Sequence, residues 1–366
     1  STPALRSFLK ALRARAGWSQ TELGRRVGLT RQSLSAIESG TSVPSTEVAL
    51  RLSEALGVSV EEIFQLAHRP HPIELAEASG LGGKLPGRVR LARVSGRRWA
   101  YGLDLGDPSG SLAADGIGTP DEEGWVRVRH MDERPPEPDL VVAGCDPAFG
   151  LVREYLQRER GLEVLWIRTG SRSALEALAR GAVHVAGVHL RDSESGAYNR
   201  PWVERVVPFP STRIAFATWE QAILVAPGNP LGIQGIGDLA RPGIRFLNRE
   251  PGSGSRALVE TALAERGLTG EEVPGFVDTA ADRHETVARA VASGAAQAGV
   301  AIRAVGQPLG LGVLHLADEP YELVVADHFL ELPAVGALLD ALLRPALRRQ
   351  VEALTGYDAA AMGRPA

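Results

Sequence analysis

Residues 17–40 read GWSQTELGRRVGLTRQSLSAIESG, and this stretch decides the fold of the first part of the chain. Ser19, followed three residues later by a glutamate, forms a capping-box pattern and predicts a helix that ends at Gly28. Thr30 predicts the cap of a second helix, which Gly40 ends. The pattern therefore indicates two short helices joined by a tight turn.

Further short helices are predicted on both sides of this pair. Apolar spacing from Leu5 to Leu12 predicts a helix before it. Two more are predicted after it, one opened by Pro44-Ser45 and one covering residues 61–66. Five helices in so short a segment make a compact all-α domain, which we place at residues 1–68.

The next segment, residues 69–137, has the composition of a linker and a small β-rich connector. A short helix is predicted near residues 73–78, and alternating apolar residues between 89 and 131 predict short antiparallel strands. These strands form either a small β module or an extended connector. The run Pro135-Pro136-Glu137-Pro138 predicts a stiff boundary after it.

From residue 138 to 366 the pattern changes to strand, turn and helix, which is typical of an α/β sheet. The predicted strands are Leu140–Ala143, Val164–Ile167, Val183–Leu190, Ile244–Leu247 and Phe276–Val277. Asp146 is predicted to cap the helix after the first of them, with Pro147 at its first position. The last part of the chain, 332–354, is predicted to be helical.

Two apolar stretches, Ile214–Val225 and Val313–Val325, lack the strand-turn-helix pattern. We interpret them as segments that cross between two lobes. Ligands of such sheets bind at the carboxyl ends of the strands, where helix N-termini point. The sequence therefore predicts a two-lobed α/β body with a ligand site between its lobes.

Composition narrows the classes of function. The chain has 366 residues, 44% of them hydrophobic and 23% charged, as in globular proteins. No apolar run has the ~18 residues of a membrane span, and no secretory pattern is recognised, so we expect a cytoplasmic protein without a membrane partner. A single cysteine, Cys145, excludes an intrachain disulfide and a CxxC zinc site.

Charge is unevenly distributed along the chain. The net charge is −4, yet residues 1–31 hold seven basic residues and one acidic residue. A basic first domain followed by an acidic body is typical of proteins in which only the first domain binds a polyanion.

The first domain resembles the Cro/Xre-type phage-repressor DNA-binding domain. The resemblance rests on residues 17–40, on Pro44-Ser45 and on residues 52–58. It implies a helix-turn-helix that binds double-stranded operator DNA, and an Arg13–Glu38 ion pair between the first and third helices. Because one head of this size reads too few base pairs for useful specificity, we also expect a homodimer or larger assembly. The resemblance also implies that Gln20 contacts a phosphate. Short polar and forked side chains suited to base edges follow on the second helix of the motif: Thr30, Arg31, Gln32, Ser33 and Ser35.

The body resembles the type-two periplasmic-binding-protein-like domain, most closely the branch related to molybdate and tungstate binding. Its glycine- and serine-rich turns carry the resemblance, while Glu250-Pro251 departs from the more polar pair typical of that position. Helix N-termini also favour an anion on physical grounds. The predicted ligand-binding residues are Asp146, Ser171, Ser173, His189, Tyr198, Arg249, Ser253, Gly254, Ser255, Arg256 and His284. Arg249 or Arg256 can supply the charge, and we expect it to be Arg256.

We therefore expect a one-component transcription regulator that senses a small ligand, with molybdate or tungstate as that ligand and no other cofactor. A sensor of a small organic acid is one alternative. The other is an enzyme or cofactor-handling protein of molybdenum metabolism with a regulatory head. No P-loop and no Gly-x-Ser-x-Gly motif occurs, which argues against an enzyme. No metal site is expected either, since His284 lacks a second helical histidine and Cys145 is interpreted as a small buried residue.

Overall fold

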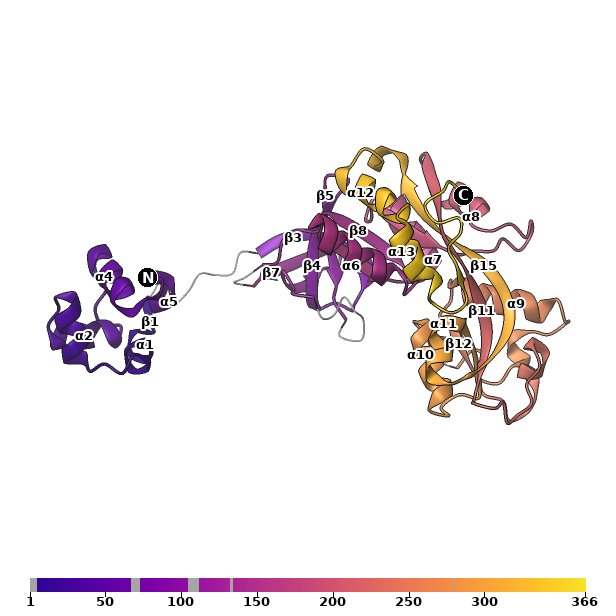
Figure 1. Ribbon diagram of the computed structural model, residues 1–366, viewed down its shortest axis with the longest axis horizontal. Helices are drawn as coiled ribbons and strands as arrows, with labels where there is room; N and C mark the ends of the chain where they lie inside the picture. The colour runs from indigo at the N-terminus through magenta and orange to yellow at the C-terminus, as the bar shows by residue number, and fades with distance from the viewer. Residues whose placement is uncertain (1–4, 67–72, 105–111, 132–133, 279) are drawn as a thin grey trace. The chain divides into compact units, whose positions relative to one another are not determined.

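The computed structural model describes residues 5–66, 73–104, 112–131, 134–278 and 280–366 (Figure 1). Tertiary contacts divide the chain into two compact units, Ser1–Pro72 and Ile73–Ala366. We call the first unit the head and the second unit the body. None of the described helices is long and apolar enough to cross a membrane.

The head is a bundle of short helices, as predicted. Its helices are α1 (Leu9–Arg15), α2 (Gln20–Val27), α3 (Arg31–Glu38), α4 (Thr46–Leu56) and α5 (Val60–Ile63). The hydroxyls of Ser19, Thr30 and Ser45 accept the backbone N–H groups that cap α2, α3 and α4. Buried leucines, valines and isoleucines from all five helices form its core: Leu9, Leu23, Val27, Leu34, Ile37, Leu52 and Ile63.

The ends of the head differ from the sequence prediction. Leu5 does not begin the first helix but lies in β1 (Leu5–Ser7), which pairs antiparallel with β2 (Phe64–Leu66). The fifth helix accordingly stops at Ile63, before the predicted end at residue 66. Pairing between these two distant segments outweighs the local helical spacing of each.

The body begins with a closed barrel of five strands in the order β3-β5-β4-β6-β7. The strands are β3 (Ile73–Gly82), β4 (Gly87–Val94), β5 (Arg97–Gly102), β6 (Gly116–Pro120) and β7 (Trp125–His130). The helix predicted near residues 73–78 is wrong, because this segment hydrogen-bonds to β5 on one side and β7 on the other. Of the two expected forms, the structure has the folded β module.

The barrel is packed on the rest of the body. Trp99 and Tyr101 of β5 belong to the same buried cluster as the strands and helices of the α/β sheet. The Tyr101 hydroxyl donates to the carbonyl of Ala182 at 2.5 Å. Arg90 of β4 donates to the carbonyl of Pro136 at 2.7 Å. These buried contacts fix the barrel to the sheet.

The remainder of the body is one nine-stranded sheet in the order β13-β12-β14-β11-β15-β10-β8-β9, with β16 beside β11. The strands are β8 (Leu140–Gly144), β9 (Val164–Arg168), β10 (Val185–Val188), β11 (Ser211–Val225), β12 (Phe246–Arg249), β13 (Ala280–Ala281), β14 (Ala298–Ile302), β15 (Gly312–Ala326) and β16 (Tyr357–Asp358). The helices are α6 (Phe149–Arg160), α7 (Ser171–Ala179), α8 (Arg200–Val206), α9 (Gly254–Ala264), α10 (His284–Ala292), α11 (Arg303–Gly306), α12 (Pro333–Leu342) and α13 (Pro345–Glu352).

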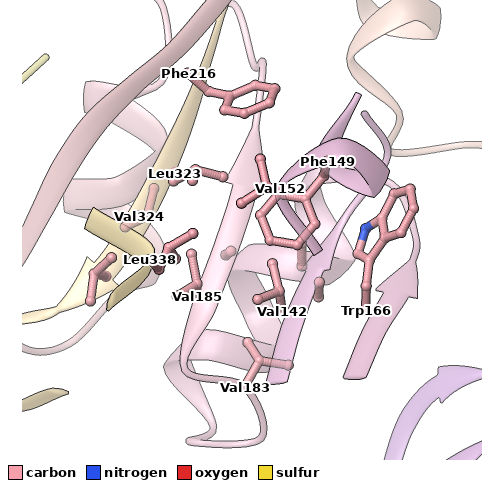
Figure 2. Close-up of a cluster of buried hydrophobic side chains, with 14 of the residues drawn as sticks. Val142, Phe149, Val152, Trp166, Val183, Val185, Phe216, Leu323, Val324 and Leu338 are labelled. Atoms are coloured by element: carbon pink, nitrogen blue, oxygen red, sulfur yellow. The ribbon is translucent and has the colours of Figure 1, made fainter. Parts of the chain in front are cut away.

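The two long strands, β11 and β15, run antiparallel beside each other through both lobes (Figure 1). One end of β15 pairs with β10 in the first lobe, and the opposite end of β11 pairs with β14 in the second. The two predicted crossing segments are therefore confirmed as the shared strands. Figure 2 shows part of the first lobe's core, where Phe149 of α6 packs on Trp166 of β9 at 5.7 Å between ring centroids.

Two local predictions in the body are corrected. Phe276 is not in a strand; it is a buried loop residue whose ring stacks on Phe246 at 6.2 Å, and the strand follows at Ala280–Ala281. Asp146 does not cap α6, which begins three residues later with Ala148 at its N-cap. The Asp146 carboxylate instead accepts the backbone N–H of Ala148 at 2.8 Å.

Candidate functional site

In the head, α3 presents a polar face to solvent. Thr30, Arg31, Gln32, Ser33 and Ser35 are all exposed, on the cap and outer side of the helix. Its opposite side is anchored in the core by two buried apolar residues. The residues predicted to contact base edges are thus brought together on one accessible surface.

A polar network behind α3 connects three helices. The Arg13 guanidinium of α1 donates to the Glu38 carboxylate of α3 at 2.5 Å, which confirms the predicted ion pair. Gln20, at the start of α2, donates its side-chain amide to the same carboxylate at 2.8 Å. The phosphate contact predicted for Gln20 stays a prediction, and its amide also has a structural role.

We expect Glu38→Gln to lower the free energy of unfolding of the head and to change how that free energy depends on pH. Burial by itself would raise the pKa of Glu38, but the hydrogen bonds from Arg13 and Gln20, with the Arg13 charge, hold it below its ordinary value of 4.5. A carboxyl group whose pKa is lower in the folded state than in the unfolded state stabilises the fold. This stabilisation is complete at pH values above the pKa of the unfolded state, and it is lost as the pH falls through the pKa of the folded state. At neutral pH the variant should lose about 2 kcal/mol.

Hydrogen–deuterium exchange of the α1 and α3 amides in the full chain measures this effect. The control is Glu47→Gln, which removes an exposed carboxylate that is paired with Arg51. If the two variants exchange alike at neutral pH, or if Glu38→Gln loses as much protection in acid as the wild type, the assigned role of Glu38 is wrong.

In the body, the middle of the two long strands carries polar residues that are fully enclosed. Gln221 of β11 and Glu319 of β15 have no exposed surface. The Gln221 amide donates to Glu319 Oε2 at 3.1 Å and to the Ser255 hydroxyl at 2.9 Å. His189, just after β10, shares a hydrogen with the same Glu319 oxygen through Nδ1 at 2.9 Å.

We call this group the cleft cluster and define it by its buried polar members: Asp146, His189, Gln221, Arg249, His284 and Glu319. Trp219 packs against both of its histidines, with ring centroids 4.8 Å from His189 and 5.3 Å from His284. The cluster is therefore built by strands and helix ends of both lobes.

Three helix N-termini meet at the cluster. The Ser171 hydroxyl, at the start of α7, accepts the backbone N–H of His189 at 3.1 Å. Gly254, at the start of α9, lies so close to His189 that a Cβ there would collide with its carbonyl. His284 is itself the first residue of α10. These ends supply the positive pole of each helix to one place.

The turn before α6, expected to be a fourth anion-binding turn, has a different partner. The backbone N–H groups of Cys145 and Asp146 face the Tyr321 hydroxyl at 3.2 and 3.4 Å. The hydroxyl of Tyr357 donates to Asp146 at 2.6 Å. Two tyrosines of the body thus occupy the polar groups of this turn.

Several buried polar atoms of the cluster have no hydrogen-bond partner among the described residues. They are Asp146 Oδ2, Trp219 Nε1, Gln221 Oε1, Arg249 Nη1, Glu319 Oε1 and both ring nitrogens of His284. Buried polar groups are nearly always paired in folded proteins, since leaving one unpaired costs about 1–3 kcal/mol. Their concentration at one place between the lobes is typical of a site that holds a polar ligand.

The environment also shifts the protonation of the cluster. Burial by itself would lower the pKa of His189, but Cys145 and Glu319 raise it to about 10. Burial raises the pKa of Asp146 to about 6, against the hydrogen bond from Tyr357. Complete burial, together with the charges of Arg249 and His189, holds the pKa of His284 well below its ordinary range. At neutral pH the cluster therefore combines a charged and a neutral imidazole.

Arg249 and Arg256 lie in different surroundings. Arg249 is buried and donates through Nε and Nη2 to Glu250, each at 3.0 Å, while Nη1 has no partner among the residues that the structure describes. Arg256 pairs with Glu260 at 2.9 Å, one turn along α9, and lies over the Phe276 ring. The placement assigns the charge at the cluster to Arg249, in contrast to the sequence expectation.

The other predicted residues lie at the edge of the cluster or serve the fold. Ser253 caps α9 by accepting the Arg256 N–H, as an ordinary N-cap. Ser173 is exposed and lines an open cavity of about 220 Å³ at the mouth of the cleft, beside Gly170 and Gly252. Tyr198 is half-buried, and burial together with nearby Glu319 raises the pKa of its hydroxyl.

Sequence reasoning missed three members of the site. Gln221 and Glu319 lie within the two predicted crossing segments but were not predicted as site residues, and Cys145, which lies beside the cleft cluster, was interpreted as a small core residue. A polar residue within an otherwise apolar strand is the signal that identifies Gln221, because burial of its amide requires partners. No local signal places Cys145 beside His189, since 44 residues separate them in the sequence.

Comparison with known proteins agrees with this organisation. The family described as the PBP superfamily domain matches residues 152–343, more than half of the chain, and a helix-turn-helix family matches residues 9–63. The chain belongs to the PBP superfamily domain family and carries a helix-turn-helix head. This combination is that of a transcription regulator with a ligand-binding body.

Relatives cover the two units separately. The uncharacterized protein YvgK of Bacillus subtilis is 29% identical over 239 residues, which are 64% of this chain and 77% of YvgK. The uncharacterized HTH-type transcriptional regulator YgzD of the same organism is 45% identical over 62 residues, 17% of this chain and 94% of YgzD. A phosphate-bound substrate-binding protein of Clostridium perfringens aligns with a TM-score of 0.46 and 13% identity, covering 58% of this chain and 96% of that protein.

Proposed function

We propose that the protein is a one-component transcription regulator whose affinity for operator DNA is set by a small anion bound in the cleft cluster. The observation that carries the proposal is the group of unpartnered buried polar atoms between the lobes. A DNA-binding head on a body with such a site has the parts of a sensor, and no catalytic role is proposed.

The ligand we propose is a tetrahedral oxyanion, with molybdate and tungstate as first candidates. Arg249 Nη1 is a buried cationic donor without a partner, and the N-termini of α7, α9 and α10 add their positive poles. His189, with its raised pKa, adds a second charged donor. Glu319 and Asp146 are acidic, so the anion is expected to bind where Arg249 and the helix ends face it rather than at the acidic side.

The small organic acid remains the second candidate for the ligand. Tyr198 and Trp219 offer aromatic surface beside the polar groups, which suits a carbon skeleton attached to a carboxylate. Both ligands use Arg249, and both act as effectors rather than substrates.

On the DNA side, we propose that α3 enters the major groove as one of a pair of heads in a homodimer. Such a pair reads two half-sites whose centres lie about 34 Å apart, or a multiple of that distance. The change in the free energy of operator binding cannot exceed the difference between the ligand's binding free energies for the two arrangements of the heads.

We expect Arg31→Ala and Gln32→Ala each to relax base preference at one position of each half-site, at a cost of about 1–3 kcal/mol. The reason is that both side chains are exposed on the first turn of α3, where base edges are read. Gel shifts on duplexes selected from a random library, with and without molybdate, measure both the preference and its dependence on the ligand.

Arg158→Ala is the matched control, because this arginine is exposed on the body and pairs only with glutamates of its own helix. Uniform weakening on every sequence by both α3 variants would assign them to phosphate contacts instead. Operator affinity that no oxyanion and no organic acid changes would remove the sensor role.

A further inference from the structure

A thiol and two imidazoles meet beside the cleft cluster. Cys145 Sγ and one ring nitrogen each of His189 and His284 lie within 4.8 Å of one another, and all three residues are buried. They come from three separate elements: the end of β8, the segment after β10 and the first turn of α10. Sulfur and imidazole nitrogen are the donors that Zn²⁺ and copper prefer, whereas Mg²⁺ and Ca²⁺ prefer oxygen.

The surroundings of both histidines suit metal binding. His284 is fully buried, and within the described part of the chain neither of its nitrogens has a hydrogen-bond partner, which an ion would supply. His189 contacts the Glu319 carboxylate through Nδ1 at 2.9 Å, which leaves Nε2 to face an ion. A carboxylate on the second nitrogen fixes the tautomer and orientation of most metal-binding histidines.

We propose that Cys145, His189 and His284 form a three-ligand site for a transition metal ion of intermediate softness, with Zn²⁺ as the first choice. Ligand atoms around a tetrahedral Zn²⁺ lie about 3.4 Å apart, so the three side chains need to approach one another by up to about 1.4 Å. On binding, Cys145 releases its thiol proton and His189 releases the proton on Nε2, both to solvent, so that Cys145 ligates as the thiolate and His189 as the neutral imidazole. The thiolate and the Glu319 carboxylate together balance the charge of the ion.

Three protein ligands leave a fourth position for water or an anion. The metal site itself does not depend on the proposed effector. Only the use of the fourth position by an oxyanion rests on the proposed function, in which case the metal would hold one oxygen and Arg249 another.

The test uses the full chain, reduced with a phosphine, stripped with a chelator and titrated with Co²⁺ and then Zn²⁺. We expect one equivalent of Co²⁺ per chain, with a thiolate-to-cobalt charge-transfer absorption that Zn²⁺ abolishes by displacement. Cys145→Ser should lose this absorption, and His284→Gln should bind Zn²⁺ at least about 10-fold more weakly. Glu319→Gln, which keeps a neutral partner for His189, should bind about 10–100-fold more weakly.

His315→Gln is the matched control, since His315 is exposed and faces Glu220 outside the cluster. Circular dichroism of each variant confirms that the fold is kept. A wild-type protein without the charge-transfer absorption overturns the proposal, as does Co²⁺ binding that survives both Cys145→Ser and His284→Gln. Tighter binding of Cu⁺ through the same three residues supports the site and assigns it to copper.

Operator binding measured on the same samples separates this proposal from the proposed function. If the metal site passes these tests while no form of the protein binds DNA, the regulator role fails and the metal site stands. If the protein does not bind the metal while oxyanions still change its operator affinity, the metal site fails and the regulator role stands.

Discussion

Arg249→Met should weaken the binding of molybdate or tungstate by at least about 100-fold, because removing one partner of a buried charge pair costs about 2–5 kcal/mol. Arg249 is 1% exposed and presents Nη1 without a partner, while its other nitrogens are held by Glu250 and by the carbonyls of Ala281 and Asp282. Methionine keeps most of the buried volume, so the loss reports charge and hydrogen bonding rather than packing.

Isothermal calorimetry of the full chain with molybdate, tungstate and sulfate gives the comparison. Sulfate separates a fitted pocket from a merely positive one, since it has the same charge and shape but shorter bonds. Arg256→Ala is the control, because that side chain pairs with Glu260 on the outer face of α9. If Arg256→Ala loses oxyanion binding and Arg249→Met keeps it, Arg256 supplies the charge, as expected from the sequence. If only an organic acid binds and its affinity falls in Arg249→Met, the ligand is an organic acid and not an oxyanion.

Asp115→Ala should destabilise the body by about 3–5 kcal/mol, the usual cost of leaving a buried charge without its partner. The Asp115 carboxylate accepts the Arg90 guanidinium at 3.1 Å and the backbone N–H of Leu91 at 2.7 Å. Arg90 is 1% exposed, and the second carboxylate near its guanidinium, that of Glu163, lies farther away at 3.8 Å. Because Arg90 also holds the Pro136 carbonyl, the loss loosens the barrel from the sheet.

Urea unfolding of the full chain, followed by circular dichroism, measures the change in free energy. Glu154→Ala is the control, since it removes an exposed carboxylate 3.8 Å from Arg158 and should cost less than about 1 kcal/mol. The double variant Asp115→Leu with Arg90→Met should recover part of the loss, because it removes both charges together. If Asp115→Ala behaves like Glu154→Ala, the pair does not secure the barrel.

Local sequence patterns were enough to predict the five helices of the head. Caps such as Ser19 and Thr30 are read from the residue and its immediate followers, and the ion pair of Arg13 with Glu38 followed from the family pattern. The pairing of Leu5 with Leu66 was missed because it depends on a contact between the two ends of the domain, for which the sequence between them carries no signal.

Several strands of the body's sheet and both crossing segments were also predicted, but the strand at Phe276–Val277, the first strand of the barrel and the partners within the site were not. His189 and His284 were each recognised alone, yet only the sheet order brings them beside Cys145 and Glu319. From the sequence alone, Arg249 and Arg256 are equally good candidates for the cationic residue of the site. They differ in the structure because Arg249 is the last residue of β12 and lies buried in the cleft cluster, whereas Arg256 lies on α9 and pairs with Glu260.

β11 and β15 belong to both lobes, and Gln221 and Glu319 lie at the middle of these strands. The site we propose is thus built on the two strands that both lobes share, rather than on loops that belong to one lobe. A substitution at Gln221 or Glu319 would therefore change a contact between the shared strands together with the surroundings of the proposed ligand.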